Sequence, residues 1–217
     1  MKNKDLVERY PKLYHMAEKG TWPSIKANGL LSTTAVLDRF GLTGPQRRGI
    51  EEGHRPEKVL VGSANFGIVI RDQKPMIPSR LKDALIDGTT PSEWYKFLNG
   101  RVFMWARQER LYGLLGAKQY RNLEHDVLTI DSKSLIEAYS DKVWLCRMNS
   151  GNTFPVPHPR GLVDFKRIPD YPTKKLSGAP LKEVVEIVID YSIPDIAKFV
   201  IEVRRMKAKE IIETLSL

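Results

Sequence analysis

The sequence predicts an α+β domain with a mainly antiparallel or mixed sheet. Short β-biased segments are spread along the 217 residues, and helical segments are inserted between them at irregular intervals. A doubly wound α/β sheet would instead alternate strands and helices regularly. A chain of this length fits one substantial domain, so we predict a single domain over residues 1–217.

The individual elements follow from the spacing of apolar residues. Alternating or β-branched apolar runs predict strands, whereas apolar residues three or four positions apart predict helices. Strands are expected at residues 13–17, 59–61, 67–70, 101–105, 127–131, 143–147, 183–189 and 199–203. Helices are expected at residues 3–9, 23–28, 33–40, 79–86, 91–98, 106–115, 132–139 and 208–215. Residues 41–56 are expected to form a mobile, lid-like loop, and the proline-rich segment 149–180 to wrap the surface.

Residues 13–31, LYHMAEKGTWPSIKANGLL, combine a strand, a turn and a short helix. Thr21 is placed to cap the helix, Pro23 stands in its first turn, and Gly29 supplies a left-handed stop. His15 therefore ends a strand beside a helix N-terminus, where free N–H groups attract anions. From these residues alone, His15 either holds a ligand hydroxyl or phosphate or satisfies a neighbouring carbonyl.

Composition narrows the class of protein. Hydrophobic residues make up 41% and charged residues 28% of the chain, which is typical of a globular protein. The N-terminus lacks the apolar core of a signal peptide and no run of about 18 apolar residues occurs, so we expect a cytoplasmic protein that does not enter a membrane. Cys146 lies in an apolar run and is expected to be a core thiol. The four histidines lack metal-ligand spacing, so no metal site is expected.

The charge of the chain indicates an anionic partner. Thirty-five Lys and Arg against 26 Asp and Glu give a net charge of +9, and a field of this sign favours nucleic acid or an anionic cofactor. The excess is spread along the chain, and Arg47, Arg48, Arg107 and Arg110 are the candidate nucleic-acid contacts. A solvated surface with a basic bias explains the same charge equally well.

Glu186 is the first candidate for a catalytic carboxylate. It lies within the apolar strand at residues 183–189, where a carboxylate is costly unless it is paired or stands at a cleft. Because strand faces alternate, Glu186 shares a face with Val184 and Val188, whereas Glu183 lies on the other face. A carboxylate there can orient a hydroxyl or stabilise positive charge in glycosidic chemistry. An exposed strand face is the alternative, and Glu183 is the second candidate.

Three blocks of the chain resemble, in order, the motifs of ADP-ribosyltransferase-fold proteins of the DarT-like kind. The first block comprises His15, Trp22, Ile25, Gly29 and Leu30; the second is the strand RVFMW at residues 101–105; the third is EIVI from Glu186, followed by Ile193-Pro194. The chain also resembles an uncharacterised bacterial family that shares LYH…W-x-S-I…GLLS, IRDQ-x-P and VF-x-W blocks. The common GxGxxG, P-loop and GxSxG motifs are absent.

This resemblance implies a split mixed or antiparallel sheet with inserted helices, and it implies NAD as the substrate. Glu186 would bind the 2′-hydroxyl of the nicotinamide ribose and stabilise an oxocarbenium-like transition state, or act as base toward the acceptor. Arg71, at the end of a strand, would lie by the pyrophosphate or the acceptor; from the residues alone, a pair with Asp72 or another carboxylate explains it equally well. The implied cofactor-binding residues are His15 for the adenosine-side ribose, Phe103 and Trp105 for the nicotinamide pocket, and Ser24, Gly29 and Leu30 around them.

The resemblance and the net charge together favour a nucleic acid as acceptor, a DNA base ahead of RNA. The resemblance further implies a toxin, with an antitoxin or an ADP-ribose-removing protein as its partner. Three alternatives stay open: an NAD glycohydrolase that uses water as acceptor, an RNA 2′-phosphotransferase on the same fold, and a non-catalytic basic domain that binds nucleic acid.

Overall fold

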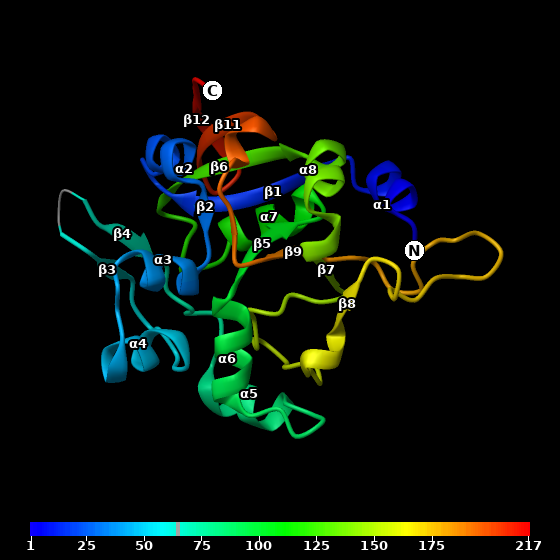
Figure 1. Cartoon of the computed structure of the whole chain (residues 1–217), viewed down its shortest axis with the longest axis horizontal. Coiled ribbons are helices and arrows are strands. Elements are labelled where there is room, and N and C mark those ends of the chain that lie inside the picture. The colour runs from blue at the N-terminus through cyan, green and yellow to red at the C-terminus, as the bar shows by residue number, and fades with distance from the viewer. Residues whose placement is uncertain (64–65) are drawn as a thin grey trace.

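An eight-stranded sheet forms the centre of the computed structural model (Figure 1), which describes residues 1–63 and 66–217. The strand order is β12-β11-β6-β1-β5-β9-β7-β8, and each neighbouring pair is antiparallel. The predicted α+β class with a largely antiparallel sheet is therefore confirmed. Two short two-stranded pairs, β10 with β2 and β3 with β4, lie outside this sheet.

Most of the predicted strands and helices are present in the predicted order, whereas a helix at residues 44–51 and a strand at residues 210–215 differ from the prediction. The strands are β1 (Lys12–Glu18), β2 (Leu30–Leu31), β3 (Val59–Val61), β4 (Ile68–Ile70), β5 (Arg101–Trp105), β6 (Glu124–Asp131), β7 (Val143–Cys146), β8 (Phe165–Arg167), β9 (Glu186–Asp190), β10 (Ser192–Ile193), β11 (Val200–Lys207) and β12 (Glu210–Leu215). The helices are α1 (Asn3–Arg9), α2 (Trp22–Asn28), α3 (Thr33–Arg39), α4 (Gly44–Glu51), α5 (Pro78–Ala84), α6 (Pro91–Asn99), α7 (Gln108–Leu115) and α8 (Ser132–Tyr139), with 3-10 turns at Ser140–Lys142, Leu162–Asp164 and Ile196–Lys198.

The sheet is weakly joined at its middle. β1 pairs with β6 along its whole length, from Lys12 to Glu18, whereas the register between β1 and β5 contains the single pair Tyr14 and Trp105. The sheet thus consists of a half with β12, β11, β6 and β1 and a half with β5, β9, β7 and β8, which separate beyond that pair. A gap between strands exposes backbone groups that a ligand can reach.

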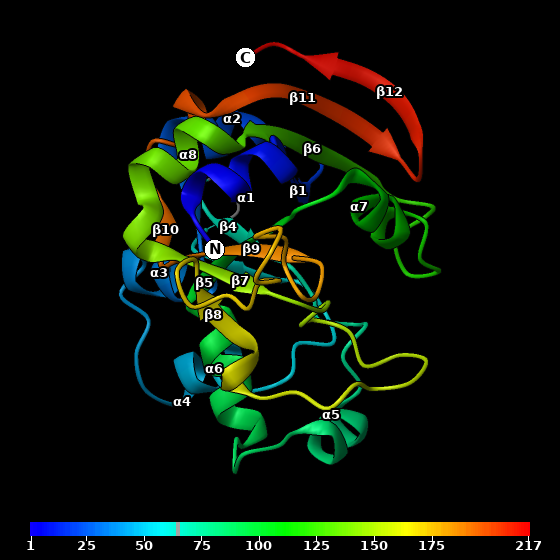
Figure 2. The same cartoon turned by 90° about the vertical axis from the view of Figure 1, so that its right-hand side faces the viewer.

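Helices cover both faces of the sheet (Figure 2). On one face α1 and α8 bury Leu6, Leu135 and Ile136 against the strands, and this is the largest core. On the other face α7 covers the β1–β6 half through Leu111 and Leu115, whereas α5 and α6 cover the half that contains β7 and β9. The two groups of helices on this second face belong to different halves of the sheet, so the boundary between the halves has no single covering helix.

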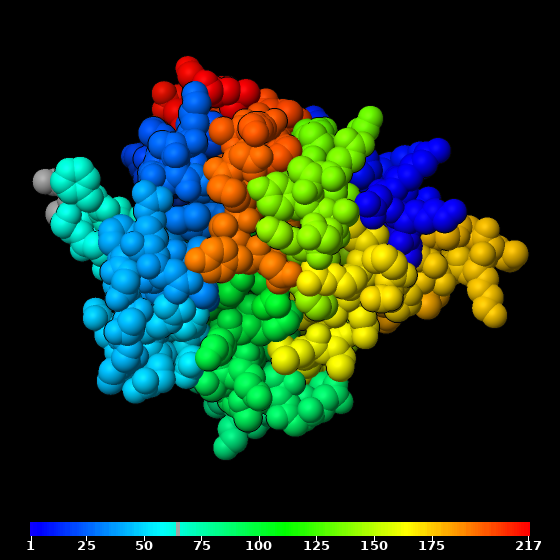
Figure 3. Space-filling view, viewed as in Figure 1, coloured from blue at the N-terminus to red at the C-terminus, as the bar shows by residue number. Residues whose placement is uncertain are grey.

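The segment after β9 closes one side of the molecule. It carries β10 and a 3-10 turn, and it lies between α2–α3 and α8 on the surface shown in Figure 3. β10 pairs with β2, which fixes the exit of α2 to the end of β9. The positions of α2 and Glu186 are thereby linked, although they are far apart in the sequence.

The predicted mobile loop at residues 41–56 is wrong, because the chain forms α4 there. Pro45 stands in the first turn of this helix, Ile50 is buried, and Arg47 pairs with Glu51 one turn later at 2.9 Å. An i,i+4 ion pair and a buried apolar side chain are enough to stabilise a short helix that packs against the rest of the protein. The Gly- and Arg-rich composition of the segment is the reason that a loop was predicted.

The predicted C-terminal helix at residues 208–215 is also wrong. Ala208 adopts a φ of +47°, the chain reverses, and β12 pairs with β11 as the edge strand of the sheet. Ile211 and Ile212 are both about half exposed, at 48% and 47%. Adjacent apolar residues that resembled a helical stripe therefore belong to an edge strand.

The proline-rich segment 149–180 does more than wrap the surface. It supplies β8 to the edge of the sheet, and Ser150, Thr153 and Arg160 within it are buried. Thr153 accepts a hydrogen bond from the Ile77 N–H at 2.7 Å, which ties the segment to the chain before α5.

The helices of the described residues were also compared with the length and hydropathy of a membrane span, and none of them meets both requirements.

Candidate functional site

A cavity of about 570 Å³ opens at the junction between β1 and β5. Its walls come from β1, α2, β4 and β5, from the turn at residues 149–151, and from the first residue of β9. This volume lies within the range of small-molecule and cofactor sites. All the residues predicted as catalytic or cofactor-binding line it, namely His15, Ser24, Gly29, Leu30, Arg71, Phe103, Trp105 and Glu186.

Glu186 is a buried carboxylate that lines this cavity. Its side chain is 4% exposed, and Oε1 accepts a hydrogen bond from the Ser150 backbone N–H at 3.2 Å. Oε2 has no hydrogen-bond partner among the described residues. Burial raises the pKa of Glu186 to about 7, although hydrogen bonds from Ser150 and the charge of Arg160 oppose the rise. A buried carboxylate oxygen without a partner is costly and indicates a site for a ligand donor.

Glu183, the second candidate, lies elsewhere. It is exposed just before β9 and does not line the cavity. Arg107 and Arg110 pair with its two oxygens at 2.6 and 2.7 Å, and these contacts lower the pKa of Glu183. Strand β9 begins at Glu186, three residues later than its predicted start. Geometry therefore favours Glu186 over Glu183 as the carboxylate of the cavity.

His15 lies where the two halves of the sheet separate. Its Nδ1 is 2.8 Å from the Phe103 carbonyl oxygen on β5. A carbonyl can only accept, so Nδ1 carries the hydrogen and Nε2 of the neutral ring is an acceptor. Burial lowers the pKa of His15 to about 4. The charge of Arg71 acts in the same direction, whereas the hydrogen bond to the Phe103 carbonyl opposes the change. The residue thus satisfies a carbonyl and also offers Nε2 as an acceptor to a hydroxyl donor.

Two arginines give the cavity a positive wall. Arg71 donates to the Met16 carbonyl at 3.2 Å and lies 5.1 Å from the centroid of the Tyr120 ring, and its buried Nε has no partner among the described residues. Arg55 is 7% exposed and donates to the Asn99 side chain at 2.9 Å and to the Arg71 carbonyl at 3.2 Å. Burial lowers the pKa of Arg55 to about 10, so it stays charged at neutral pH. Guanidinium groups that, like these two, have no carboxylate partner in residues 1–63 and 66–217 suit an anionic ligand.

Phe103 and Trp105 provide the aromatic part of the cavity. Both are partly exposed and lie on the same face of β5, where Trp105 pairs in register with Glu186 and Phe103 with Val188. Phe103 also packs edge-on against Phe165 with the ring centroids 6.4 Å apart. A planar aromatic ligand could stack on this surface beside the Glu186 carboxylate.

Helix α2 and the residues after it build a further wall. Gly29 has the predicted positive φ, +86°, and a Cβ at this position would lie 2.6 Å from the Pro194 Cα. Leu30 is buried and pairs with Ile193, whereas Ser24 is exposed at the cavity surface. The predicted cap by Thr21 is not formed: Asp126 instead accepts from the Gly20 and Trp22 N–H groups, at 2.8 and 3.3 Å.

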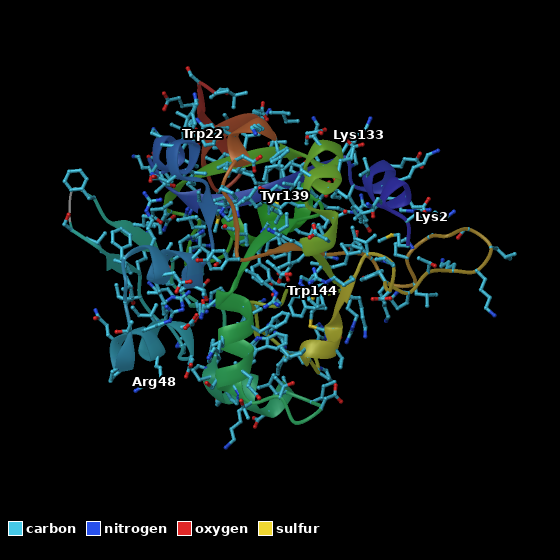
Figure 4. The ribbon with its side chains drawn as sticks, in the orientation of Figure 1. Lys2, Trp22, Arg48, Lys133, Tyr139 and Trp144 are labelled. Carbon is cyan, nitrogen blue, oxygen red and sulfur yellow. The ribbon has the colours of Figure 1, made fainter. Side chains whose placement is uncertain are left out.

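The four arginines predicted to contact nucleic acid are not brought together. Arg47 and Arg48 lie on α4, whereas Arg107 and Arg110 lie at the start of α7, and the two helices stand apart in Figures 1 and 2. Arg47 pairs with Asp38 and Glu51, and the other pair holds Glu183. Arg48 is exposed and points away from the sheet in Figure 4. None of the four lines the cavity.

Sequence reasoning missed several residues of the site. Arg55 lies in the segment predicted as a loop, and Ser150 and Arg160 lie in the proline-rich segment, so neither strand nor helix periodicity singled them out. Tyr120, which lines the cavity, donates to Asp72 at 2.7 Å. Asp72 and Gln73 of the IRDQ block were the sequence signal that could have indicated Arg55 and Tyr120. Gln73 accepts from the Arg55 N–H at 3.1 Å, and Asp72 accepts from the Tyr120 hydroxyl.

Comparison with known proteins assigns the chain to a family. It matches the Family of unknown function (DUF7002) over residues 11–200, and the protein belongs to this family. The matched range includes β1, β5 and β9 with their cavity residues. A search of curated proteins gave no significant match. In the part of the chain that the structure describes, no group of three or more His, Cys, Asp or Glu side chains could hold a metal ion.

Proposed function

We propose that the protein is an NAD-dependent ADP-ribosyltransferase, which cleaves the nicotinamide glycosidic bond and transfers ADP-ribose to an acceptor. The observation that carries the proposal is Glu186: a buried carboxylate whose Oε2 lacks a partner among the described residues, in a cavity with a histidine, two guanidinium groups and an aromatic wall. The resemblance of the three sequence blocks to DarT-like proteins supports the same reaction.

The chemistry assigns each of these groups a part. As the C1′–N bond breaks, its electron pair leaves with nicotinamide, and positive charge develops on the ribose. Glu186 Oε2 accepts a hydrogen bond from the ribose 2′-hydroxyl and stabilises that charge. The acceptor then bonds to C1′ and loses a proton, for which a carboxylate with a pKa of about 7 is a competent base. Phe103 and Trp105 hold the nicotinamide ring.

The rest of the cofactor is held farther along the cavity. His15 Nε2 accepts from a hydroxyl of the adenosine-side ribose, and Arg71, whose carbonyl Arg55 holds in place, faces the pyrophosphate. We propose a nucleic acid as the acceptor, a DNA base ahead of RNA, because the net charge is +9. Arg48, which forms no ion pair among the described residues, is the most available of the four arginines for this contact.

Incubation with NAD tests the proposal directly. The protein is mixed with NAD and, in separate reactions, with double-stranded DNA, single-stranded DNA, RNA, a cell lysate or buffer. Nicotinamide release is followed by chromatography and the acceptor by mass spectrometry. We expect nicotinamide release and an ADP-ribose adduct on DNA. Release in buffer alone to the same extent would indicate a glycohydrolase, and salt-dependent nucleic-acid binding without any release would indicate a non-catalytic domain.

Two matched variants make this experiment specific. Glu186→Gln keeps the size of the side chain and removes the charge, and we expect a loss of at least about a hundredfold in nicotinamide release. Glu183→Gln makes the same change three residues earlier, outside the cavity, and should retain activity. A folded Glu186→Gln protein with unchanged activity would refute the assignment.

A further inference from the structure

Arg160 is a buried residue that contacts the turn beside Glu186. It is 1% exposed, and it does not line the cavity. Its Nη1 donates to the Ser150 carbonyl at 3.1 Å, and its Nε donates to the His158 carbonyl at 3.1 Å. The backbone N–H of the same Ser150 donates to Glu186 Oε1. Arg160 is thus connected to the Glu186 carboxylate through the backbone of one residue, Ser150.

A guanidinium group in this position needs an explanation. Burial of a cation costs free energy unless a carboxylate lies close by, and Arg160 forms no ion pair among the described residues. Burial lowers the pKa of Arg160, and the nearby carboxylates of Glu186 and Asp164 oppose this change. A guanidinium group keeps its proton in proteins, so Arg160 is a buried cation close to the Glu186 carboxylate, held by carbonyl groups.

We propose that Arg160 is a positioning residue for Glu186: by holding the Ser150 carbonyl it fixes the turn at residues 149–151, and this turn places the Ser150 N–H on Oε1 and leaves Oε2 for a ligand. This role rests on the proposed transferase function. Arg160 does not touch the ligand. It acts through the turn at residues 149–151, which forms part of the cavity wall.

The same arrangement sets the charge of the carboxylate. Burial is the largest influence on the pKa of Glu186 and raises it, and the Ser150 hydrogen bonds and Arg160 counteract this rise. From β7, Cys146 pairs in register with Glu186, but burial raises the pKa of its thiol, so it stays neutral. From β5, the partner is Trp105, which does not titrate. Loss of Arg160 therefore removes a positive charge that, within the part of the chain that the structure describes, favours ionised Glu186.

Arg160 also has contacts that a purely structural residue would have. Its backbone N–H donates to the Ala84 carbonyl, its carbonyl accepts from Ile86, and its guanidinium lies 6.0 Å from the Trp94 ring centroid. A loss of stability alone would therefore not distinguish the two roles. The readout must report the carboxyl group of Glu186.

The decisive measurement is a carbon-13 NMR titration of the Glu186 side-chain carboxyl, with its resonance assigned by its absence in Glu186→Gln. In the unmodified protein we expect a midpoint near 7. In Arg160→Met we expect the midpoint to rise by about one pH unit or more, and in Arg160→Lys, which keeps the charge, by less. Arg204→Met is the control, because Arg204 pairs with Glu202 on β11 and neither residue lines the cavity, and the Glu186 midpoint should not move in this variant. An unchanged midpoint in folded Arg160→Met overturns the proposal.

A thermodynamic cycle covers the case in which Arg160→Met folds poorly. At pH 8, where Glu186 is mostly ionised, Arg160→Met should lower the melting temperature strongly, and in the Glu186→Gln background it should do so much less. Equal losses in both backgrounds would mean that Arg160 only supports its carbonyl and Trp94 contacts, and the proposal would fail.

Neither measurement needs NAD, so their failure is distinguishable from failure of the proposed function. If NAD is not consumed but the titration midpoint moves, the positioning of Glu186 stands and the transferase assignment falls. If NAD is consumed and the midpoint does not move, the transferase assignment stands and the positioning role of Arg160 falls. Where both succeed, Arg160→Met should also shift the pH profile of nicotinamide release upward by the same amount as the carboxyl midpoint.

Discussion

Trp105 on β5 lies directly opposite Glu186 on β9, in antiparallel register and on the same face of the sheet. Directly opposed residues have their Cβ atoms about 5 Å apart, so the indole lies beside the carboxylate. Trp105 is also the β5 residue that pairs with β1, at Tyr14. The aromatic surface and the carboxylate therefore meet at the point where the two halves of the sheet begin to separate.

This relationship predicts the effect of changing Trp105. If nicotinamide stacks on the indole, Trp105→Ala should lower kcat/KM for NAD by about tenfold or more, and Trp105→Phe should retain most of it. Trp144→Phe is the control, because Trp144 lies outside the cavity and donates to Asp190. Steady-state nicotinamide release measures all three. Equal losses for the Ala and Phe variants would argue against stacking.

The pH dependence of the reaction should report Glu186. In the proposed reaction its ionised form stabilises the developing positive charge, and burial raises its pKa to about 7. Nicotinamide release should therefore rise with pH, about tenfold per pH unit well below 7, and level off above it. Glu183→Gln should leave this profile unchanged. A rate that is flat between about pH 5 and pH 9 would show that no carboxyl with a raised pKa takes part.

The same raised pKa predicts a cost in stability. A carboxyl whose pKa is about 7 in the folded protein and 4.5 when exposed to water binds its proton more tightly when folded. Stability from this residue is therefore present below about pH 4.5 and is lost as the pH rises through 7. Between pH 5 and pH 8, Glu186→Gln should gain, relative to the unmodified protein, on the order of 3 kcal/mol in free energy of unfolding.

Urea denaturation at both pH values measures this gain. If the difference between the two proteins is the same at pH 5 and pH 8, Glu186 does not titrate with a raised pKa. A buried residue that lines a cavity and destabilises the protein at neutral pH is typical of a functional site.

The candidate residues lie together although several of the elements around them differ from the prediction. Local patterns single out His15 and Glu186, the resemblance adds Phe103 and Trp105, and all four line one cavity. Their convergence depends on the pairing of β1 with β5 and of β5 with β9, which local periodicity does not specify. The order of the three resembling blocks, and not the pairing of the strands, is what predicts from the sequence that these residues meet.

Elsewhere, local patterns were ambiguous in physical terms. The run Glu210–Leu215 has adjacent apolar residues that suit either a helix or an edge strand, and only its pairing with β11 decides between them. Arg160 carries no sequence signal at all, because a buried arginine is recognised by its carbonyl partners and not by its neighbours in the chain. Positions that act through backbone contacts are therefore the ones that sequence reasoning misses.

Gly29 gives a prediction in which two physical effects can be separated. Its φ is +86°, and an added Cβ would lie 2.6 Å from the Pro194 Cα, whereas Gly20 has a similar φ of +79° with nothing within 4 Å. Gly20→Ala should therefore cost only the backbone strain, about 1 kcal/mol, and Gly29→Ala should cost roughly 3 kcal/mol or more because β10 must also move away from β2. Urea denaturation measures both, and equal losses would show that the close approach to Pro194 has no energetic effect.

The Gly29→Ala variant should also weaken NAD binding, because Gly29 and Leu30 line the cavity. Gly113→Ala is the control within α7, where nothing lies within 4 Å of an added Cβ. This change should stabilise the protein by about 0.5 to 1 kcal/mol and leave NAD binding unchanged.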